Sequence, residues 1–303
     1  MKKALSILLV VVMTMTMLIG CSSKSAEEVD VNSGAEETTT EETTEEETTE
    51  EVTTEEETPE EATETATGLA TEGKFVVGFD AEYPPYGYMD DNGEYTGFDL
   101  EMAEALAALN GWELVKTPIS WDSKDMELDS GSIDCVWNGF TINGREDQYT
   151  WSMPYVDNSQ VMIVAEDSGI NTLADLADKR VGVQAASAAW ELLEDKQKDL
   201  ADTFKELQTF PDYNNAFVEL QAGAVDAVAM DIGVAIYQIN SRGEGFKLID
   251  EILAAEQYGV GVKLGNEALR DKINEGLLEL LDNGTFAELA EKYELTDMVC
   301  LGR

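Results

Sequence analysis

Histidine is absent from this sequence of 303 residues, and cysteine occurs only three times. Without histidine the chain lacks the most common general base and metal ligand, and it has no Ser-His or Cys-His nucleophile pair. The cysteines stand at positions 21, 135 and 300, so no C-x-x-C pair is present to hold zinc or an iron–sulfur cluster. We therefore expect neither a metal site nor any other cofactor.

Basic residues are also scarce, because Lys and Arg number 19 against 63 Asp and Glu, a net charge of −44. A nucleic-acid partner needs a basic footprint, and anionic lipid needs basic clusters, so this composition argues against both. The excess is not confined to one segment. Residues 74–303 alone carry 44 acidic and 16 basic residues, a net charge of −28.

The first 20 residues have a basic start and an apolar run that ends in Leu18-Ile19-Gly20-Cys21. The run is too short for a comfortable membrane span and fits a secretory signal. Its end resembles the lipobox of bacterial lipoproteins. The resemblance implies a signal peptide over 1–20, cleavage after Gly20 and lipid on Cys21. The alternative is an ordinary cleaved signal followed by a chance cysteine.

Residues 21–73 form a segment of different composition, and 36–64 are almost entirely Glu and Thr. No apolar residue recurs there with a period of 3.6 or 2, so no core can form and disorder is expected. Repulsion between the acids should extend the chain. We interpret the segment as a spacer that lifts a domain off the membrane. A low-complexity tail with no role beyond solubility is equally compatible with this composition.

From residue 74 onward, short apolar runs alternate with helical periodicities. Strands are expected at 74–79, 113–119, 133–137, 160–165, 180–183, 206–210, 225–230 and 258–262. Helices are expected at 100–109, 121–130, 172–176, 188–196, 212–221, 232–239, 267–282 and 285–293. Asp99 is predicted to be the N-cap of the first helix. The alternation predicts an α/β protein with mostly parallel sheets, in two similar halves.

The stretch from Ile133 to Arg145 carries the first candidate site. A buried strand over 133–137 is followed by Asn138, Gly139, Thr141 and Arg145, and the end of a strand is where an open α/β sheet usually holds its ligand. A guanidinium can grip a carboxylate with two parallel bonds, and a carbonyl and a hydroxyl can accept from an ammonium group. These groups complement the head of a free α-amino acid. The alternative is a loop whose arginine pairs with a nearby aspartate.

Further candidates follow other predicted strands. Small residues around Ser187 let backbone N–H groups at a helix start face an anion. Asp231 ends a buried strand, where it can serve a site, cap the next helix, or do both. Tyr83 lies on a loop stiffened by two prolines and could form a ligand wall.

The order of these features resembles the polar-amino-acid substrate-binding proteins of bacterial ABC importers. The motifs are Tyr83-Pro84-Pro85-Tyr86, Gly97-Phe98-Asp99, Gly131-Ser132-Ile133-Asp134, Trp137 to Thr141 with Arg145, Pro154-Tyr155, Val181 to Gln184, and Gly223 to Ala227 with Asp231. The resemblance covers about residues 74–295. It implies a two-lobed α/β fold of the type II periplasmic-binding-protein kind, with a ligand cleft between the lobes and two hinge crossovers. Lobe 1 would be 74–157 plus 257–303, and lobe 2 would be 158–256.

The same resemblance implies a role for each site residue. Arg145 pairs with the ligand α-carboxylate, Ser187 joins it beside backbone amides, and Asp231 holds the α-ammonium. The implied ligand-binding set is Asp80, Tyr83, Trp121, Asn138, Gly139, Thr141, Arg145, Ala186, Ser187 and Asp231. Tyr83 and Trp121 would sandwich the ligand side chain, and Asp80 would lie at the pocket mouth. Two departures stand out: the segment from Thr141 to Arg145 is one residue shorter than usual, and position 188 is Ala where a second hydroxyl is common.

The function expected from the resemblance is binding of a free polar amino acid and its delivery to an ABC permease and ATPase. The protein would be a monomer, lipid-anchored on the outer face of the membrane of a Gram-positive bacterium, and would not be an enzyme. Asp80 and the aromatic pair favour a cationic ligand, although glutamine or cystine fits almost as well. Alternatives are a sensing module for a partner protein and a dehydratase-like enzyme, which the missing histidine disfavours. Cys135 and Cys300 could pair or stay free.

Overall fold

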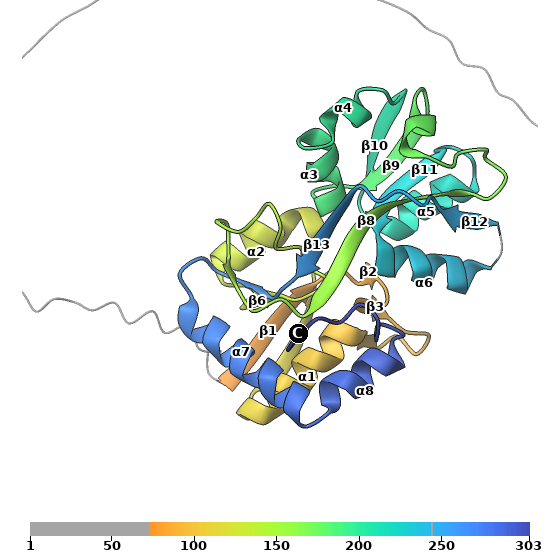
Figure 1. Cartoon of the computed structure of the whole chain (residues 1–303). Coiled ribbons are helices and arrows are strands. Elements are labelled where there is room, and N and C mark those ends of the chain that lie inside the picture. Colours follow the sequence, from red (N-terminus) through yellow and green to blue (C-terminus); the bar gives the residue numbers. More distant parts are fainter. Residues whose placement is uncertain (1–72, 244) are drawn as a thin grey trace, which may run out of the picture. The chain divides into compact units, whose positions relative to one another are not determined.

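The computed structural model describes residues 73–243 and 245–303 (Figure 1). The predicted signal peptide, the predicted lipid site Cys21 and the Glu/Thr-rich spacer up to residue 72 lie outside the described residues. Among the helices of the described part, none is both long enough and apolar enough to cross a membrane.

Five strands form a first sheet in the order β5-β1-β6-β14-β7. The strands are β1 (Lys74–Phe79), β5 (Glu113–Pro118), β6 (Cys135–Val136), β7 (Thr150–Trp151) and β14 (Gly261–Val262). β1 lies parallel to β5 and β6, whereas β14 is antiparallel to β6 and β7. Beside this sheet, β2 (Glu82–Tyr83), β3 (Gly87–Met89) and β4 (Tyr95–Thr96) form a small antiparallel sheet.

Four helices belong to the first sheet, and together they form what we call the first lobe. They are α1 (Phe98–Asn110), α2 (Lys124–Ser130), α7 (Glu267–Asp282) and α8 (Thr285–Lys292), with a 3-10 turn, η2 (Trp121–Ser123), before α2. α1, α7 and α8 pack against one another in pairs (Figure 1). A side chain at Gly276 would come within 2.7 Å of Leu106, so glycine permits the close approach of α7 to α1.

A second sheet has the order β10-β9-β11-β8-β12, with β13 also paired to β8, and we call it with its helices the second lobe. The strands are β8 (Val156–Ala165), β9 (Arg180–Gln184), β10 (Glu206–Phe210), β11 (Ala227–Asp231), β12 (Phe246–Leu248) and β13 (Ala254–Tyr258). The helices are η3 (Leu173–Leu176), α3 (Ala188–Glu194), α4 (Lys198–Ala201), α5 (Tyr213–Gln221) and α6 (Ile232–Arg242). β9, β10 and β11 are parallel, while β8 runs against β11.

The two lobes are joined by β8 and β13, which lie side by side and run antiparallel (Figure 1). Their register pairs Val156 with Tyr258 at one end and Gln160 with Ala254 at the other. Both passages of the chain between the two sheets therefore lie in one paired ribbon. A buried cluster of tyrosine rings also links the lobes, because Tyr83 of the first lobe lies 5.8 Å from Tyr213 of the second, measured between ring centroids.

Most predicted elements are present, but several differ from the prediction. The strand expected at 133–137 is only two residues long, and the strand expected at 258–262 divides between β13 and β14. The division arises where the chain leaves the ribbon for the first sheet, at Gly259, whose N–H bonds to the Phe140 carbonyl. A side chain at Gly259 would come within 2.8 Å of Ile142. β12 and the rest of β13 were not predicted at all.

Asp99 does not cap α1, so that prediction is wrong. The helix begins at Phe98 with Gly97 in the N-cap position, and Asp99 is fully buried in the first turn. Asp99 Oδ2 accepts from the Gly139 N–H at 2.5 Å and from the Tyr155 hydroxyl at 2.8 Å. Burial raises the pKa of this carboxyl from 3.8 to about 7. Both cysteines in the described part of the chain, Cys135 and Cys300, are free thiols.

Candidate functional site

Seven of the ten predicted site residues line a single small cavity between the lobes. They are Tyr83, Trp121, Gly139, Thr141, Arg145, Ser187 and Asp231, joined by Gln184, Ala188 and Tyr213. The cavity measures about 10 Å³, which is room for one water at most. Parallel strands of both sheets direct their carboxyl ends to this place, since Asp80 follows β1, while Gln184 ends β9 and Asp231 ends β11.

The other three predicted residues, Asp80, Asn138 and Ala186, do not line this cavity but bond to residues that do or to one another. The Asn138 Oδ1 accepts from the Asp80 N–H at 3.0 Å, and Asp80 Oδ2 accepts from Gln184 Nε2 of the second lobe at 2.6 Å. The Ala186 carbonyl accepts from Arg145 Nη2 at 3.3 Å. Burial raises the pKa of Asp80 from 3.8 to about 6. The hydrogen bonds from the Glu82 N–H and the Gln184 amide act in the opposite direction and lower this pKa, but burial has the larger effect.

The loop that carries the first-lobe part of the site depends on Gly139. Its φ of 55° lies in the left-handed region, and a Cβ at this position would come within 2.7 Å of the Tyr83 ring. The Asp99 carboxylate accepts a hydrogen bond from the Gly139 N–H. Glycine thus lets the backbone lie close to the Tyr83 ring, and the hydrogen bond to Asp99 holds the loop in that position.

Arg145 reaches the cavity in spite of the shortened segment before it. It is 2% exposed, and its guanidinium carbon lies 5.3 Å from the centre of the Phe140 ring. Its Nε and Nη2 both donate to Oε1 of Glu191 on α3, at 3.2 and 2.7 Å. The alternative of pairing with a nearby aspartate is therefore not what the structure shows. The partner lies 46 residues away, on the other lobe.

A pair of buried carboxylates, those of Asp231 and Glu256, forms a second part of the candidate site. Asp231 Oδ1 and Glu256 Oε1 both accept from Asn158 Nδ2 and from Gln160 Nε2, at 2.7 to 2.8 Å. Thr141 Oγ1 also donates to Glu256 at 2.8 Å. Burial, followed by the negative charge of Asp231, raises the pKa of Glu256 from 4.5 to about 7.

Asp231 lines the small cavity, and its side chain does not cap the following helix. It occupies the N-cap position of α6, but its side chain makes no cap bond. The carboxylate accepts instead from Tyr258 at 2.6 Å and from Tyr213 at 3.3 Å, besides the two amides. Ser187 caps α3, because its Oγ accepts from the Trp190 N–H at 3.1 Å, and it lines the cavity as well.

Seven residues that touch the predicted ones were not identified from the sequence: Asn158, Gln160, Gln184, Glu191, Tyr213, Glu256 and Tyr258. The sequence contained a signal for four of them. Asn158 and Gln160 alternate in β8, and Glu256 and Tyr258 alternate in β13, and side chains two apart in a strand share a face. Glu191, in contrast, has no local signal, since it is an ordinary polar position of a short helix.

The aromatic side chains assigned to the ligand wall are buried. Trp121 meets the Phe140 ring edge-on at 5.4 Å, and Lys124 Nζ lies 5.3 Å above the Trp121 ring. Tyr83 shares a hydrogen bond of 3.3 Å with Tyr258. Tyr83 and Trp121 both line the small cavity, and their sandwich around a ligand stays a prediction.

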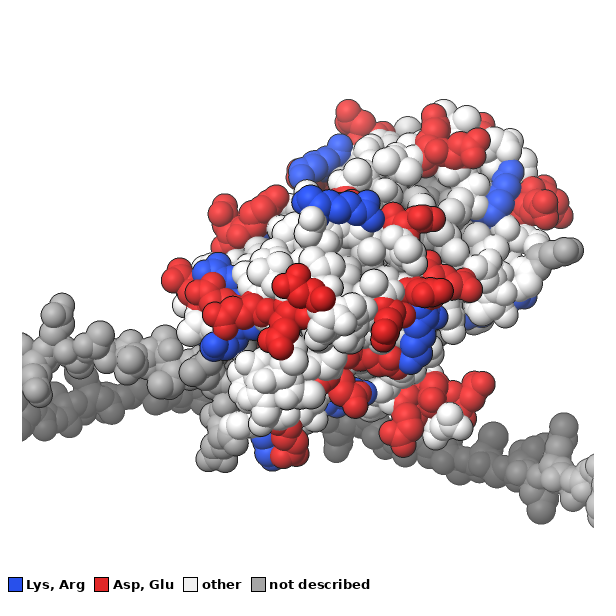
Figure 2. All heavy atoms as spheres, turned by 60° about the horizontal axis from the view of Figure 1, so that its bottom comes forward, with Lys and Arg blue, Asp and Glu red and all other residues white. Residues whose placement is uncertain are grey.

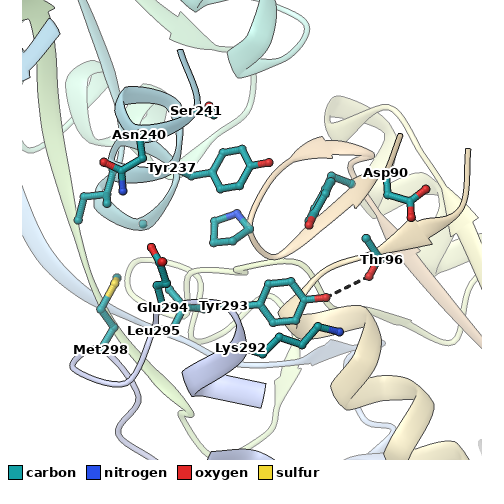
Figure 3. A pocket seen from close by; sticks show the side chains of 14 residues that line it. Asp90, Thr96, Tyr237, Asn240, Ser241, Lys292, Tyr293, Glu294, Leu295 and Met298 are labelled. Carbon is teal, nitrogen blue, oxygen red and sulfur yellow. Dashed lines mark hydrogen bonds between the residues drawn. The ribbon is translucent and has the colours of Figure 1, made fainter. Parts of the chain in front are cut away.

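A larger cavity of about 590 Å³ lies elsewhere between the lobes, between α6 and the chain around Lys292–Met298 (Figure 3). Tyr88, Tyr237 and Tyr293 line it, and the Tyr293 hydroxyl bonds to Thr96 at 3.0 Å. Lys292 is held by both oxygens of Glu101, so its charge is locally balanced. This cavity contains none of the ten predicted residues.

Acidic side chains lie over much of the face shown in Figure 2, with basic side chains scattered among them. The net charge of residues 74–303 is −28, and acidic groups are distributed across this face. Such a surface attracts cations and repels anions over distances comparable to the Debye length.

Residues 75–296 match the family model of bacterial extracellular solute-binding proteins, family 3. The chain belongs to this family. The match covers both lobes and confirms the resemblance drawn from the motifs.

The relatives include proteins named for the amino acids that they bind. The L-cystine-binding protein TcyJ of Escherichia coli (strain K12) is 30% identical over 224 residues, covering 73% of this chain and 82% of TcyJ. The arginine-binding extracellular protein ArtP of Bacillus subtilis (strain 168) is 30% identical over 240 residues, covering 76% and 91%.

A solved structure supports the same fold. An ABC uptake transporter substrate-binding protein from Streptococcus pneumoniae with bound histidine superposes with a TM-score of 0.71 at 30% identity, covering 73% of this chain and 92% of that one. The two-lobed fold of type II periplasmic binding proteins is therefore the fold of this chain.

Proposed function

We propose that this protein binds a free amino acid with a cationic side chain between its lobes and delivers it to an ABC permease. The observation that carries the proposal is the charge arrangement around the small cavity. The buried Arg145 guanidinium and the buried Asp231 carboxylate line this cavity, and the buried carboxylates of Asp80 and Glu256 accept from the lining residues Gln184 and Thr141. The buried Lys124 ammonium lies beside Arg145 at the Ala186 carbonyl. A ligand with one carboxylate and two cationic groups matches this arrangement best.

Each end of such a ligand has a partner in the proposal. The α-carboxylate bonds to Arg145 with help from Ser187 and the backbone at Ala186, as a carboxylate fits the guanidinium fork. The α-ammonium lies between Asp231 and the Gly139 and Thr141 oxygens, with Glu256 behind. The side chain extends between Tyr83 and Trp121 toward Asp80, whose support comes from Asn138 and Gln184. Aromatic faces along a cationic stem add cation–π attraction.

Closure of the lobes follows from where these groups lie. Arg145 is on the first lobe and Asp231 on the second, so a zwitterion between them favours the closed state over the open one. We propose that the hinge lies near Asp157–Gln160 and Ala255–Tyr258. These residues belong to the β8–β13 ribbon, where both passages between the lobes are paired.

The cellular setting in the proposal rests on the N-terminal sequence and on the family. We propose a signal peptide over 1–20, a lipid on Cys21, and a spacer that holds a monomeric domain on the outer face of the membrane. The role is binding, without catalysis, because Arg145 and the three carboxylates suffice to hold a ligand and the chain contains no histidine.

Calorimetric titration of the ligand-stripped protein tests this proposal. Arginine, lysine and ornithine are titrated beside glutamine, cystine and histidine. A cationic ligand at a hundred times its Kd should also add about 2.7 kcal/mol to the free energy of unfolding, visible as a shift in Tm. Preference for a neutral amino acid would retain binding and overturn the cationic specificity. Binding of none of the six would overturn the proposed function.

A further inference from the structure

The contact between Arg145 and Glu191 joins the two lobes beside the small cavity, which Arg145 lines. Arg145 comes from the loop after β6 in the first lobe, and Glu191 comes from α3 in the second. Both Nε and Nη2 of the guanidinium point at one oxygen of Glu191. These are donors that a free carboxylate would use at an arginine. A protein carboxylate therefore holds the position in which a ligand carboxylate is expected.

We propose that Glu191 is an internal competitor for the ligand carboxylate, pairing with Arg145 across the closed lobes until a ligand displaces it. The proposal rests on the proposed function, because it assumes that Arg145 is the carboxylate partner of the ligand. It makes Glu191 a determinant of how tightly ligands bind, although Glu191 itself is expected to leave the guanidinium when a ligand is bound.

The burial of the two partners decides which of them can move. The Arg145 side chain is 1% exposed, whereas the Glu191 side chain is 40% exposed. Arg145 is packed on the Phe140 ring, and its carbonyl accepts from Trp151 Nε1 at 3.0 Å. Arg145 is thus fixed in place, and displacement requires only that Glu191 rotate toward water.

A destination for the displaced carboxylate is present. A second cavity of about 210 Å³ lies beside the small one, and Ala188 at the start of α3 lines both. Glu191 and Lys196 both line this second cavity. A Glu191 carboxylate that leaves Arg145 can therefore approach the Lys196 ammonium without unfolding α3.

The surroundings of Arg145 explain why a competitor is useful in the ligand-free protein. Lys124 is 3% exposed, and its Nζ donates to the Ala186 carbonyl at 3.3 Å, as Arg145 Nη2 does. Burial, and after it the charge of Arg145, lowers the pKa of Lys124. Lys124 and Arg145 both belong to the first lobe, so their repulsion is present without a ligand, and Glu191 supplies the anion that a ligand would otherwise bring.

Two measurements on Glu191→Gln test the proposal, with Glu194→Gln as the matched control. Glu194 lies on the same helix, is exposed, and its removal changes the net charge equally. The first measurement is small-angle scattering of each ligand-stripped protein without ligand. Glu191→Gln should increase the radius of gyration as the lobes open, and Glu194→Gln should not. A radius unchanged from wild type overturns the interlobe role of Glu191, whatever the ligand is.

The second measurement is the Kd for L-arginine by calorimetry. Glu191→Gln should bind about five to ten times more tightly than wild type, because the competing charge is gone, while Glu194→Gln should match wild type. Weaker binding by Glu191→Gln would overturn the proposal and make Glu191 a residue that orients Arg145. If wild type binds no arginine or other amino acid, the proposed function fails, and the scattering result still decides the interlobe pairing on its own.

Discussion

Gln184 and Asp80 face each other across the two lobes, with Gln184 Nε2 donating to Asp80 Oδ2 over 2.6 Å. Gln184 ends β9 of the second sheet, and Asp80 follows β1 of the first. The amide holds the carboxylate in a buried place, where a charge is costly unless it finds a partner. A cationic group that reaches Asp80 would satisfy it, which gives this acid its expected part in specificity.

Asp80→Asn should weaken the binding of cationic ligands more than the binding of neutral ones. Loss of one buried charge partner should weaken arginine binding by about 30-fold or more, because the side-chain cation then meets a neutral amide. Binding of glutamine should change by less than about threefold on the same scale. Calorimetric titration of both ligands measures the difference. The control is Asp91→Asn, an exposed turn residue, and equal losses for both ligands would contradict the assignment.

Arg145→Ala should abolish amino-acid binding and leave the fold intact. Removing the guanidinium deletes the carboxylate partner, and a buried charge partner contributes enough that Kd should rise by about 100-fold or more. The partly exposed Glu191 can turn to water, so the far-UV spectrum and cooperative unfolding should persist. Arg270→Ala serves as the control, because it removes a partly exposed arginine of α7 that pairs with Asp271. Unchanged affinity in Arg145→Ala would refute the site.

The pair of Asp231 and Glu256 predicts a pH dependence of the unliganded protein. The pKa of Glu256 is raised from 4.5 to about 7 on folding, so the folded state binds more protons than the unfolded state between these values. Its contribution to stability is therefore complete below pH 4.5 and is lost as the pH rises through about 7. Asp80 and Asp99, with pKa values raised to about 6 and about 7, act in the same direction.

Denaturant unfolding of wild type and Glu256→Gln between pH 4.5 and 8 measures this effect. The variant should lose less stability across the range, by up to about 3 kcal/mol, since its amide cannot titrate. Glu94→Gln, at an exposed turn, controls for the loss of one negative charge. If the curves of wild type and Glu256→Gln run parallel, Glu256 does not titrate in this range.

Gly139→Ala should lower the stability by more than the strain of a left-handed φ alone would. A left-handed φ costs a residue with a Cβ about 1 to 2 kcal/mol, and here the added atom would also press on the Tyr83 ring. Gly93→Ala is a matched control, because its φ is 83° and nothing lies within 4 Å of the added Cβ. Thermal unfolding should show a larger loss at Gly139. Arginine binding should be lost only there, and similar behaviour of the two variants would contradict the close approach.

The fold was predictable from the sequence because its elements are local. β1, α5 and β10 come out within about one residue of their predicted bounds, since each has its own periodicity and its own breaker. β13 was missed because Ala254–Tyr258 is polar and short, and it is defined by pairing with β8 about a hundred residues earlier. Asp99 was assigned to a cap by its position, whereas its contacts are with Gly139 and Tyr155 in distant parts of the chain.

The residues that line the small cavity were largely predictable from the sequence, but their hydrogen-bond partners were not. Motifs that follow strand ends placed Arg145, Ser187 and Asp231 around one cavity, because the carboxyl ends of parallel strands converge. The partners of these residues come from elsewhere in the chain. Glu191 meets Arg145 only when two lobes approach, and Glu256 meets Asp231 only through the register of the ribbon. No spacing along the sequence encodes either meeting.

The bridging amides of Asn158 and Gln160 lie on β8, in the ribbon that connects the lobes, and Glu256 lies on its other strand. The part of the site that we propose for an ammonium group is consequently assembled where the lobes are covalently continuous. The part that we propose for a carboxylate, around Arg145, is completed only when the lobes meet. We therefore expect an ordered encounter, in which a ligand first docks by its amino end and is then trapped by its acid end. Glu256→Gln should lower the association rate constant of the ligand, and Arg145→Ala should raise its dissociation rate constant.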